Sequence, residues 1–134
     1  MELRHGFVVT QQSPEVKIHY VESNNRPHNP LIIFLHGFPE HWYSWGDYLH
    51  AVANEGYHGV ALDLRGYNES SKPSEVEEYR LDKLVEDVCA VIQHFGNKST
   101  FVVGHDWGGV IGIRALSREA DGRCSHECPL PGSS

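Results

Sequence analysis

The sequence predicts an α/β fold, with mostly parallel strands and flanking helices, from three observations. Residues 31–35 are apolar throughout, as expected for a parallel strand that is covered on both faces, and residues 57–62 and 100–103 are further strands of this buried type. An amphipathic helical pattern over residues 81–95 separates the last two runs. Buried strands that alternate with amphipathic helices are typical of a parallel sheet with right-handed crossovers.

Two further strands are expected before the first buried one. Residues 16–21 alternate apolar and polar side chains, which indicates a half-exposed strand. Residues 7–9 are expected to be its hairpin partner, with the turn-forming residues 12–14 between them. The polar, proline-containing residues 24–30 then predict a loop.

Two helices are expected between the buried strands. The first covers residues 43–53 and is ended by Gly56. The second covers residues 81–95 and is stopped by Gly96. Its apolar side chains recur at steps of three and four residues: Leu81, Leu84, Val85, Val88, Val91, Ile92 and Phe95.

The end of the chain differs in composition from the rest. Helical periodicity is lost after Leu116, and small and turn-forming residues take over. We therefore expect one core over residues 1–120 and a disordered tail over residues 121–134. The tail contains Cys124, His126 and Cys128, but three closely spaced ligands without a second pair match structural zinc sites poorly, so no metal is expected.

Composition excludes several classes of protein. The chain has 134 residues, of which 40% are hydrophobic, so one modest domain with a buried core is feasible. The net charge is −7 without a basic cluster, which argues against nucleic acid as a partner. No apolar run reaches the length of a membrane helix, about 18 residues, and residues 1–6 lack the apolar core of a signal peptide. The expectation is a cytoplasmic protein; the oligomeric state is left open.

The segment Gly104-His105-Asp106-Trp107-Gly108 predicts a tight turn between a strand and a helix. Hydrolases built on an open α/β sheet place a serine nucleophile at the tip of such a turn, the nucleophile elbow. An aspartate there would attack as a carboxylate and form an ester with a substrate carbon. The alternative is that Asp106 only caps the helix, because aspartate is a favoured N-cap residue.

A second candidate segment, residues 36–40, directly follows the first buried strand. Hydrolases of this fold take an oxyanion donor from the loop after this strand. Gly37 lets the backbone approach a substrate closely. The amides of Phe38 and Trp107 are then expected to point at one developing oxyanion. The alternative is an ordinary strand-to-helix turn.

Four segments, taken together, resemble the soluble epoxide hydrolases of the α/β-hydrolase family. They are residues 36–40, 42–45, 60–67 and 104–109, in the family's order and at similar spacing. The resemblance covers residues 3–116 and implies the N-terminal half of an α/β-hydrolase sheet, with the cap and the last strands absent. Haloalkane dehalogenases share the Asp-Trp elbow. The Phe-Pro-Glu after His36-Gly37 and the paired Gly108-Gly109 favour the epoxide hydrolases.

The resemblance implies a role for each matching residue. Asp106 would open the epoxide and become a hydroxyalkyl ester, which water hydrolyses to a diol. The backbone amides of Phe38 and Trp107 would form the oxyanion hole. The substrate pocket would be lined by Trp107, Phe38 and Pro39, and Pro39 stands where the family often has a cis proline.

The remaining residues of the two segments would have supporting roles. His36 would hold its loop in shape rather than act as general base, and His105 would shape the elbow together with Gly104 and Gly108; Gly37 would support the oxyanion loop. The partners implied are a small-molecule epoxide and water, and no metal or organic cofactor is implied.

Two departures from the family pattern stand out. Asn68 occupies the second glycine of the family's Arg-Gly-x-Gly-x-Ser segment, and asparagine tolerates left-handed backbone angles, so the turn is expected to be kept. The downstream acid, the general-base histidine and the two cap tyrosines have no counterpart. His126 of the tail is not expected to serve as base, because a base must lie rigidly within hydrogen-bond reach.

Three functional hypotheses therefore remain. The chain is an epoxide hydrolase in lineage, unable by itself to complete turnover because it is truncated. A haloalkane or haloacid dehalogenase of the same fold is the first alternative. A non-catalytic truncated isoform or interaction fragment is the second, because residues 100–103 would form a sheet edge with an uncovered apolar surface.

Overall fold

The computed structural model describes residues 2–96 and 99–120, which form a five-stranded sheet of order β1-β2-β4-β3-β5. The strands are β1 (Arg4–Gln12), β2 (Glu15–Ser23), β3 (Leu31–Leu35), β4 (His58–Leu62) and β5 (Thr100–Gly104). β3 lies parallel between β4 and β5, whereas β2 runs antiparallel to both β1 and β4. The predicted α/β class is confirmed, and the predicted hairpin forms the antiparallel half of the sheet.

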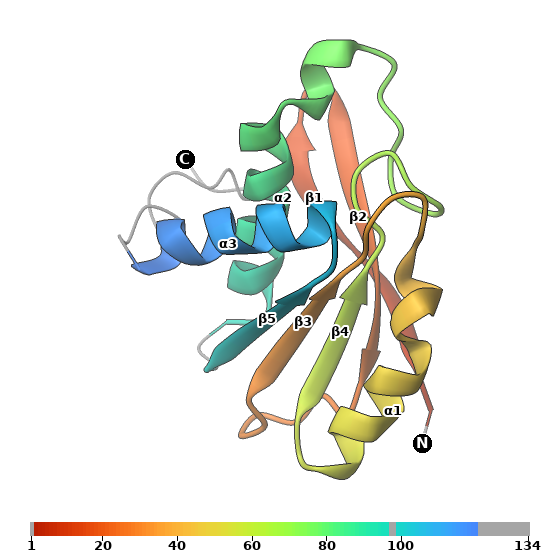
Figure 1. Cartoon of the computed structure of the whole chain (residues 1–134), viewed down its shortest axis with the longest axis vertical. Helices are drawn as coiled ribbons and strands as arrows, with labels where there is room; N and C mark the ends of the chain where they lie inside the picture. The colour runs from red at the N-terminus through yellow and green to blue at the C-terminus, as the bar shows by residue number, and fades with distance from the viewer. Residues whose placement is uncertain (1, 97–98, 121–134) are drawn as a thin grey trace.

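The sheet has helices on both faces (Figure 1). One face carries α1 (Gly46–Asn54), and the other carries α2 (Leu81–His94) and α3 (Trp107–Ala120). Two short 3-10 helices, η1 (Trp42–Trp45) and η2 (Val76–Tyr79), precede α1 and α2. The predicted second helix is confirmed almost to its last residue, and Gly96 follows it with a φ of 80°.

The first predicted helix, residues 43–53, is partly wrong at its start. Residues 42–45 form the 3-10 helix η1, and the α-helix begins only at Gly46. Trp42 and Trp45 both pack against the small core cluster that contains Phe34. A 3-10 turn places residues three apart on the same side, so both indoles reach that cluster.

Two apolar clusters form the core, one on each face of the sheet. The larger lies between the sheet and the helices α2 and α3, and it contains Ile33, Leu35, Val60, Val88 and Ile111. The smaller lies beneath α1. Strands β3 and β4 pass between the two clusters, which is why residues 31–35 and 59–62 carry no polar side chain.

β5 forms one edge of the sheet, as predicted for residues 100–103. The expectation that this strand is covered on both faces is wrong, because Phe101 is 54% exposed and Val103 is 39% exposed. The reason is its place in the sheet: α1 packs on β2 and β4 and does not extend over the edge. On the helical side Val110, Ile113 and Leu116 of α3 are also exposed.

The predicted disordered tail, residues 121–134, lies outside the described residues, and so do Cys124, His126 and Cys128. Within the part of the chain that the structure describes, no helix is long and apolar enough to cross a bilayer.

Candidate functional site

The strand-to-helix turn after β5 has the sharp geometry expected of an elbow. β5 ends at Gly104, α3 begins at Trp107, and Asp106 between them has a φ of 59°. An N-cap residue has extended backbone angles, and its side chain accepts from the second or third helical amide. Here the amides of Gly108 and Gly109 donate to the backbone carbonyls of His105 and Asp106 instead. The turn therefore differs from an ordinary capped helix start.

The Asp106 carboxylate accepts the two amides that the sequence singled out. The Phe38 N–H donates to Asp106 Oδ2 at 3.2 Å, and the Trp107 N–H also bonds the carboxylate. These bonds, that of Phe38 first, lower the pKa of Asp106 below its ordinary value. The side chain is exposed at the tip of the turn. An accessible carboxylate that stays ionised is able to act as a nucleophile.

Close backbone packing holds the elbow against the loop after β3. A Cβ on Gly37 would lie 2.6 Å from Asp106 Cβ, and a Cβ on Gly108 would lie 2.3 Å from the Leu35 carbonyl oxygen. Side chains at either position would push the two segments apart. Gly104 is equally confined, with 2.5 Å from its Cβ position to the Gly108 carbonyl oxygen. The predicted supporting glycines are thus sites of close approach.

His36 links the loop after β3 to the segment after β4. Its Nε2 atom accepts the Leu64 N–H at 2.9 Å, so the ring proton sits on Nδ1, which donates to the Gly37 carbonyl at 2.9 Å. The side chain is buried, and burial lowers the pKa of His36 below its ordinary value. A histidine whose two nitrogens are both engaged agrees with a supporting role.

The His36→Gln variant should lose part of the pH dependence of stability. A lowered pKa in the folded state means that unfolded chains bind the proton first as pH falls below about 6.5, so wild-type stability decreases there. The free energy of unfolding from urea titrations at pH 7 and pH 5 measures this effect. The variant should show a smaller difference between the two pH values. The exposed His50→Gln on α1 is the control, and equal slopes for all three proteins would contradict the assignment.

His105 and Pro39 flank the site on its exposed side. The backbone of His105 donates to the Leu35 carbonyl at 3.1 Å, and its carbonyl accepts the Gly108 N–H at 3.0 Å, so His105 joins β3 to the start of α3. Its Nδ1 atom lies 3.6 Å from a carboxylate oxygen of Glu40, and both side chains are exposed. The Phe38–Pro39 peptide bond is cis.

A cavity of about 290 Å³ lies beside the elbow. Three of the predicted site residues line it: Trp107, His36 and Gly37. Phe38 and Pro39 do not line it, and the Phe38 side chain is 68% exposed. The other lining residues come from the segment after β4, from η2 and from the starts of two helices: Leu64, Arg65, Tyr67, Tyr79, Leu81, Leu84 and Ile111. The sequence pattern predicted Leu81 and Leu84 only as part of an apolar helix face, and it assigned no role to Tyr79.

The turn after β4 is kept despite Asn68. This residue has a φ of 45°, and its side chain donates to Asp63 Oδ2 at 2.9 Å. Asparagine therefore adopts the left-handed angles that glycine would, and adds a hydrogen bond.

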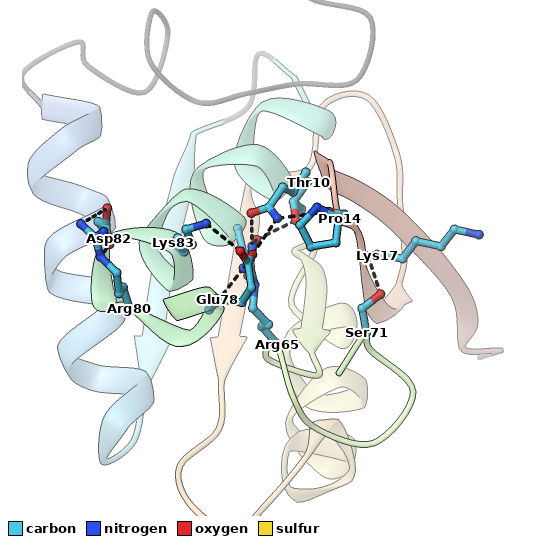
Figure 2. A network of polar contacts seen from close by, with 11 residues as sticks. Thr10, Pro14, Lys17, Arg65, Ser71, Glu78, Arg80, Asp82 and Lys83 are labelled. Carbon is cyan, nitrogen blue, oxygen red and sulfur yellow. Dashed lines mark hydrogen bonds and ion pairs between the residues drawn. The ribbon is translucent and has the colours of Figure 1, made fainter. Parts of the chain in front are cut away.

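A buried polar network fixes the wall of the cavity (Figure 2). Arg65 donates to both carboxylate oxygens of Asp87, at 2.8 and 2.9 Å, and Thr10 donates to the same carboxylate at 2.6 Å. Arg65 also donates to the Glu78 carbonyl at 2.7 Å, and these two residues are labelled in Figure 2. Glu78 belongs to η2, so the network ties η2, and with it Tyr79, to α2 and β1.

Comparison with known proteins places this geometry in a family. Residues 30–126, more than half of the chain, match the model described as alpha/beta hydrolase fold. Epoxide hydrolase 3 of Xenopus tropicalis is 41% identical over 118 residues, which are 88% of this chain and 31% of that protein. Epoxide hydrolase B of Mycobacterium tuberculosis is 48% identical over 93 residues, or 69% of this chain and 26% of that protein.

Solved structures agree with these sequence relatives. An epoxide hydrolase from Vigna radiata superposes with a TM-score of 0.79 at 38% identity, covering 88% of this chain and 37% of that one. An epoxide hydrolase from an endophytic Streptomyces gives a TM-score of 0.77 at 41% identity, covering 87% and 34%. The chain thus spans between 26% and 37% of the length of these four proteins. It belongs to the α/β-hydrolase fold family.

Proposed function

We propose that this chain carries the nucleophile and the oxyanion donors of an epoxide hydrolase. The observation that supports this most is the Asp106 carboxylate: it stands at the tip of a strand-to-helix turn with a φ of 59° and accepts the Phe38 and Trp107 amides. The relatives named epoxide hydrolases, at 41% and 48% identity, point to the same reaction.

The proposed reaction has two steps. An oxygen of the Asp106 carboxylate attacks a ring carbon of the epoxide, a new C–O bond forms, and the ring C–O bond breaks. The ring oxygen takes up a proton from the solvent and becomes the hydroxyl of a hydroxyalkyl ester. Water then adds to the ester carbonyl, and the developing oxyanion accepts the amides of Phe38 and Trp107. The diol leaves, the carboxylate is restored, and one proton returns to the solvent.

Asp106 carries out the first step, and no described residue has a role in the activation of water. General-base catalysis typically contributes about 10²–10⁴-fold to such a step. We therefore expect the isolated chain to form the ester faster than it hydrolyses it. Single-turnover chemistry, rather than steady diol production, is the property to measure.

The Asp106→Ala variant should abolish ester formation. Incubation of the 134-residue chain with styrene oxide should add one equivalent of the epoxide, seen as an increase in intact mass, and peptide mapping should place the adduct on Asp106. The exposed Asp47→Ala on α1 is the matched control and should behave like the wild type. An adduct that persists in Asp106→Ala would refute the assignment.

The same assay separates the alternative chemistries. An adduct with 1-chlorohexane but none with styrene oxide would assign dehalogenase chemistry to Asp106. A folded chain that forms no adduct with either reagent would favour a non-catalytic interaction fragment.

A further inference from the structure

Asp63 is a buried carboxylate that joins the two segments bordering the site. It directly follows β4 and is fully buried. Its Oδ1 atom accepts the Trp42 N–H at 2.8 Å, at the far end of the loop that carries Phe38. Its Oδ2 atom accepts the Asn68 side chain at 2.9 Å and the Glu69 N–H at 3.3 Å, in the turn that carries Tyr67.

We call Asp63 with its hydrogen bonds to the two segments the Asp63 anchor. Two histidines connect this anchor to the surface. His19 Nδ1 lies 2.7 Å from Asp63 Oδ2, and because a carboxylate only accepts, this nitrogen carries a proton and donates it. In neutral His19 the Nε2 atom is then an acceptor, and His5 Nδ1 lies 3.0 Å from it. His5 is exposed, and its ring also packs edge-on against Trp42, with 5.5 Å between centroids.

These contacts converge on the position of the Phe38 amide. The loop of residues 36–41 is held at its start by His36, which accepts the Leu64 amide, and at its end by the Trp42 amide on Asp63. The Phe38 N–H that bonds Asp106 lies between these two attachments. In the first step of the proposed reaction this bond orients the Asp106 carboxylate that attacks the epoxide. A misplacement of about 1 Å in such a reacting group is enough to cost roughly a hundredfold in rate.

We infer that Asp63, oriented by His19 and His5, is a positioning residue that sets the Phe38 amide against Asp106. Its effect on ester formation rests on the proposed function, whereas its effect on the Asp106 carboxylate does not. Asp63 touches no reacting atom in this scheme and acts only through the loop that it anchors.

Other charged and titratable groups near Asp106 also influence its titration, so a test has to leave these residues unchanged. They are His105 on the same turn, Glu40 paired with it, and Tyr67, whose pKa is raised by burial and by the charge of Asp106. None of them is altered in the variants below.

Three substitutions test the anchor, in order of increasing distance from the Asp63 carboxylate: Asp63→Asn, His19→Gln and His5→Gln. His58→Gln is the matched control, because His58 Nε2 forms a second buried histidine–carboxylate pair, 2.7 Å from Glu22, at the opposite end of β4. Circular dichroism verifies folding. His5 is exposed, so its variant should remain folded even where Asp63→Asn does not.

The first readout is a carboxyl carbon NMR titration of Asp106, which needs no activity. The Phe38 bond is the main cause of the low Asp106 pKa, so the titration midpoint should move up toward the ordinary aspartate value in the three variants, and most in Asp63→Asn. It should stay unchanged in His58→Gln. An unchanged midpoint in folded His19→Gln and His5→Gln would overturn the inference.

The second readout is the rate of adduct formation with styrene oxide. We expect a fall of roughly ten- to hundredfold in Asp63→Asn and His19→Gln, a smaller fall in His5→Gln, and none in His58→Gln. If the wild type forms no adduct while the NMR midpoint still moves, the proposed function fails and the positioning role stands. If adduct forms at equal rates in all folded variants, the positioning role fails and the proposed function stands.

Discussion

Replacement of Arg65 by alanine should lower the free energy of unfolding by about 3–5 kcal/mol, since removal of one partner leaves an uncompensated buried charge. The Arg65 and Asp87 side chains are 1% and 2% exposed, and Arg65 makes two of the bonds to the Asp87 carboxylate. After the substitution only Thr10 would still donate to it among the bonds seen here. Urea unfolding followed by circular dichroism measures the change.

Two further variants show whether the loss of stability comes from the buried Arg65–Asp87 pair or from the surrounding polar network. The double variant Arg65→Met with Asp87→Leu removes both charges, and such replacements are often neutral or stabilising. It should therefore recover most of the loss. Lys83→Ala removes a partly exposed ion pair with Glu78 and should cost no more than about 1 kcal/mol. Arg65→Ala as mild as Lys83→Ala would contradict the importance of the buried pair.

Gly108→Ala should damage both stability and the site. The added methyl group would lie 2.3 Å from the Leu35 carbonyl oxygen and 2.6 Å from that of His36, and backbone atoms cannot rotate away as side chains do. Overpacking of this kind typically costs about 1–3 kcal/mol or more. Because α3 would have to move from β3, the bond from the Phe38 amide to Asp106 should break, and ester formation with styrene oxide should fall roughly a hundredfold.

Gly109→Ala is the matched control in the same helical turn. Its Cβ would meet only ordinary contacts, with 3.7 Å to the nearest atom, the Gly104 carbonyl oxygen. Alanine in a helix is favoured over glycine by roughly 1 kcal/mol, so this variant should be neutral or slightly stabilised and should keep wild-type ester formation. Comparable losses for the two variants in thermal unfolding would show that close approach at Gly108 is not the cause.

Local sequence pattern predicted most elements but missed the polar contacts between them. The helix of residues 81–95 was predictable because its apolar side chains recur along one stretch. Asp87 lies within that stretch, and nothing in its neighbourhood indicates that Arg65 and Thr10 surround it. Its partners stand on two other elements, brought together only by folding.

The Asp63 anchor was invisible for a similar reason. Asp63 belongs to a segment that the resemblance identified. Its partner His19 lies in a strand of alternating apolar and polar side chains, where it resembles any other polar position of that strand. His5 is remoter still, on the neighbouring strand of the hairpin. Sequence separation hides such pairs, because a side chain's type does not reveal which distant group it meets.

The sequence by itself determined the order of strands and helices, the family and the presence of an aspartate at a strand-to-helix turn, because each is encoded in contiguous residues. Tertiary structure alone decided where the Phe38 amide points, which side chains of the edge strand β5 stay exposed, and which buried partners hold Asp63 and Arg65. These depend on register and close packing between segments far apart in the chain, where differences of an ångström decide whether a hydrogen bond forms.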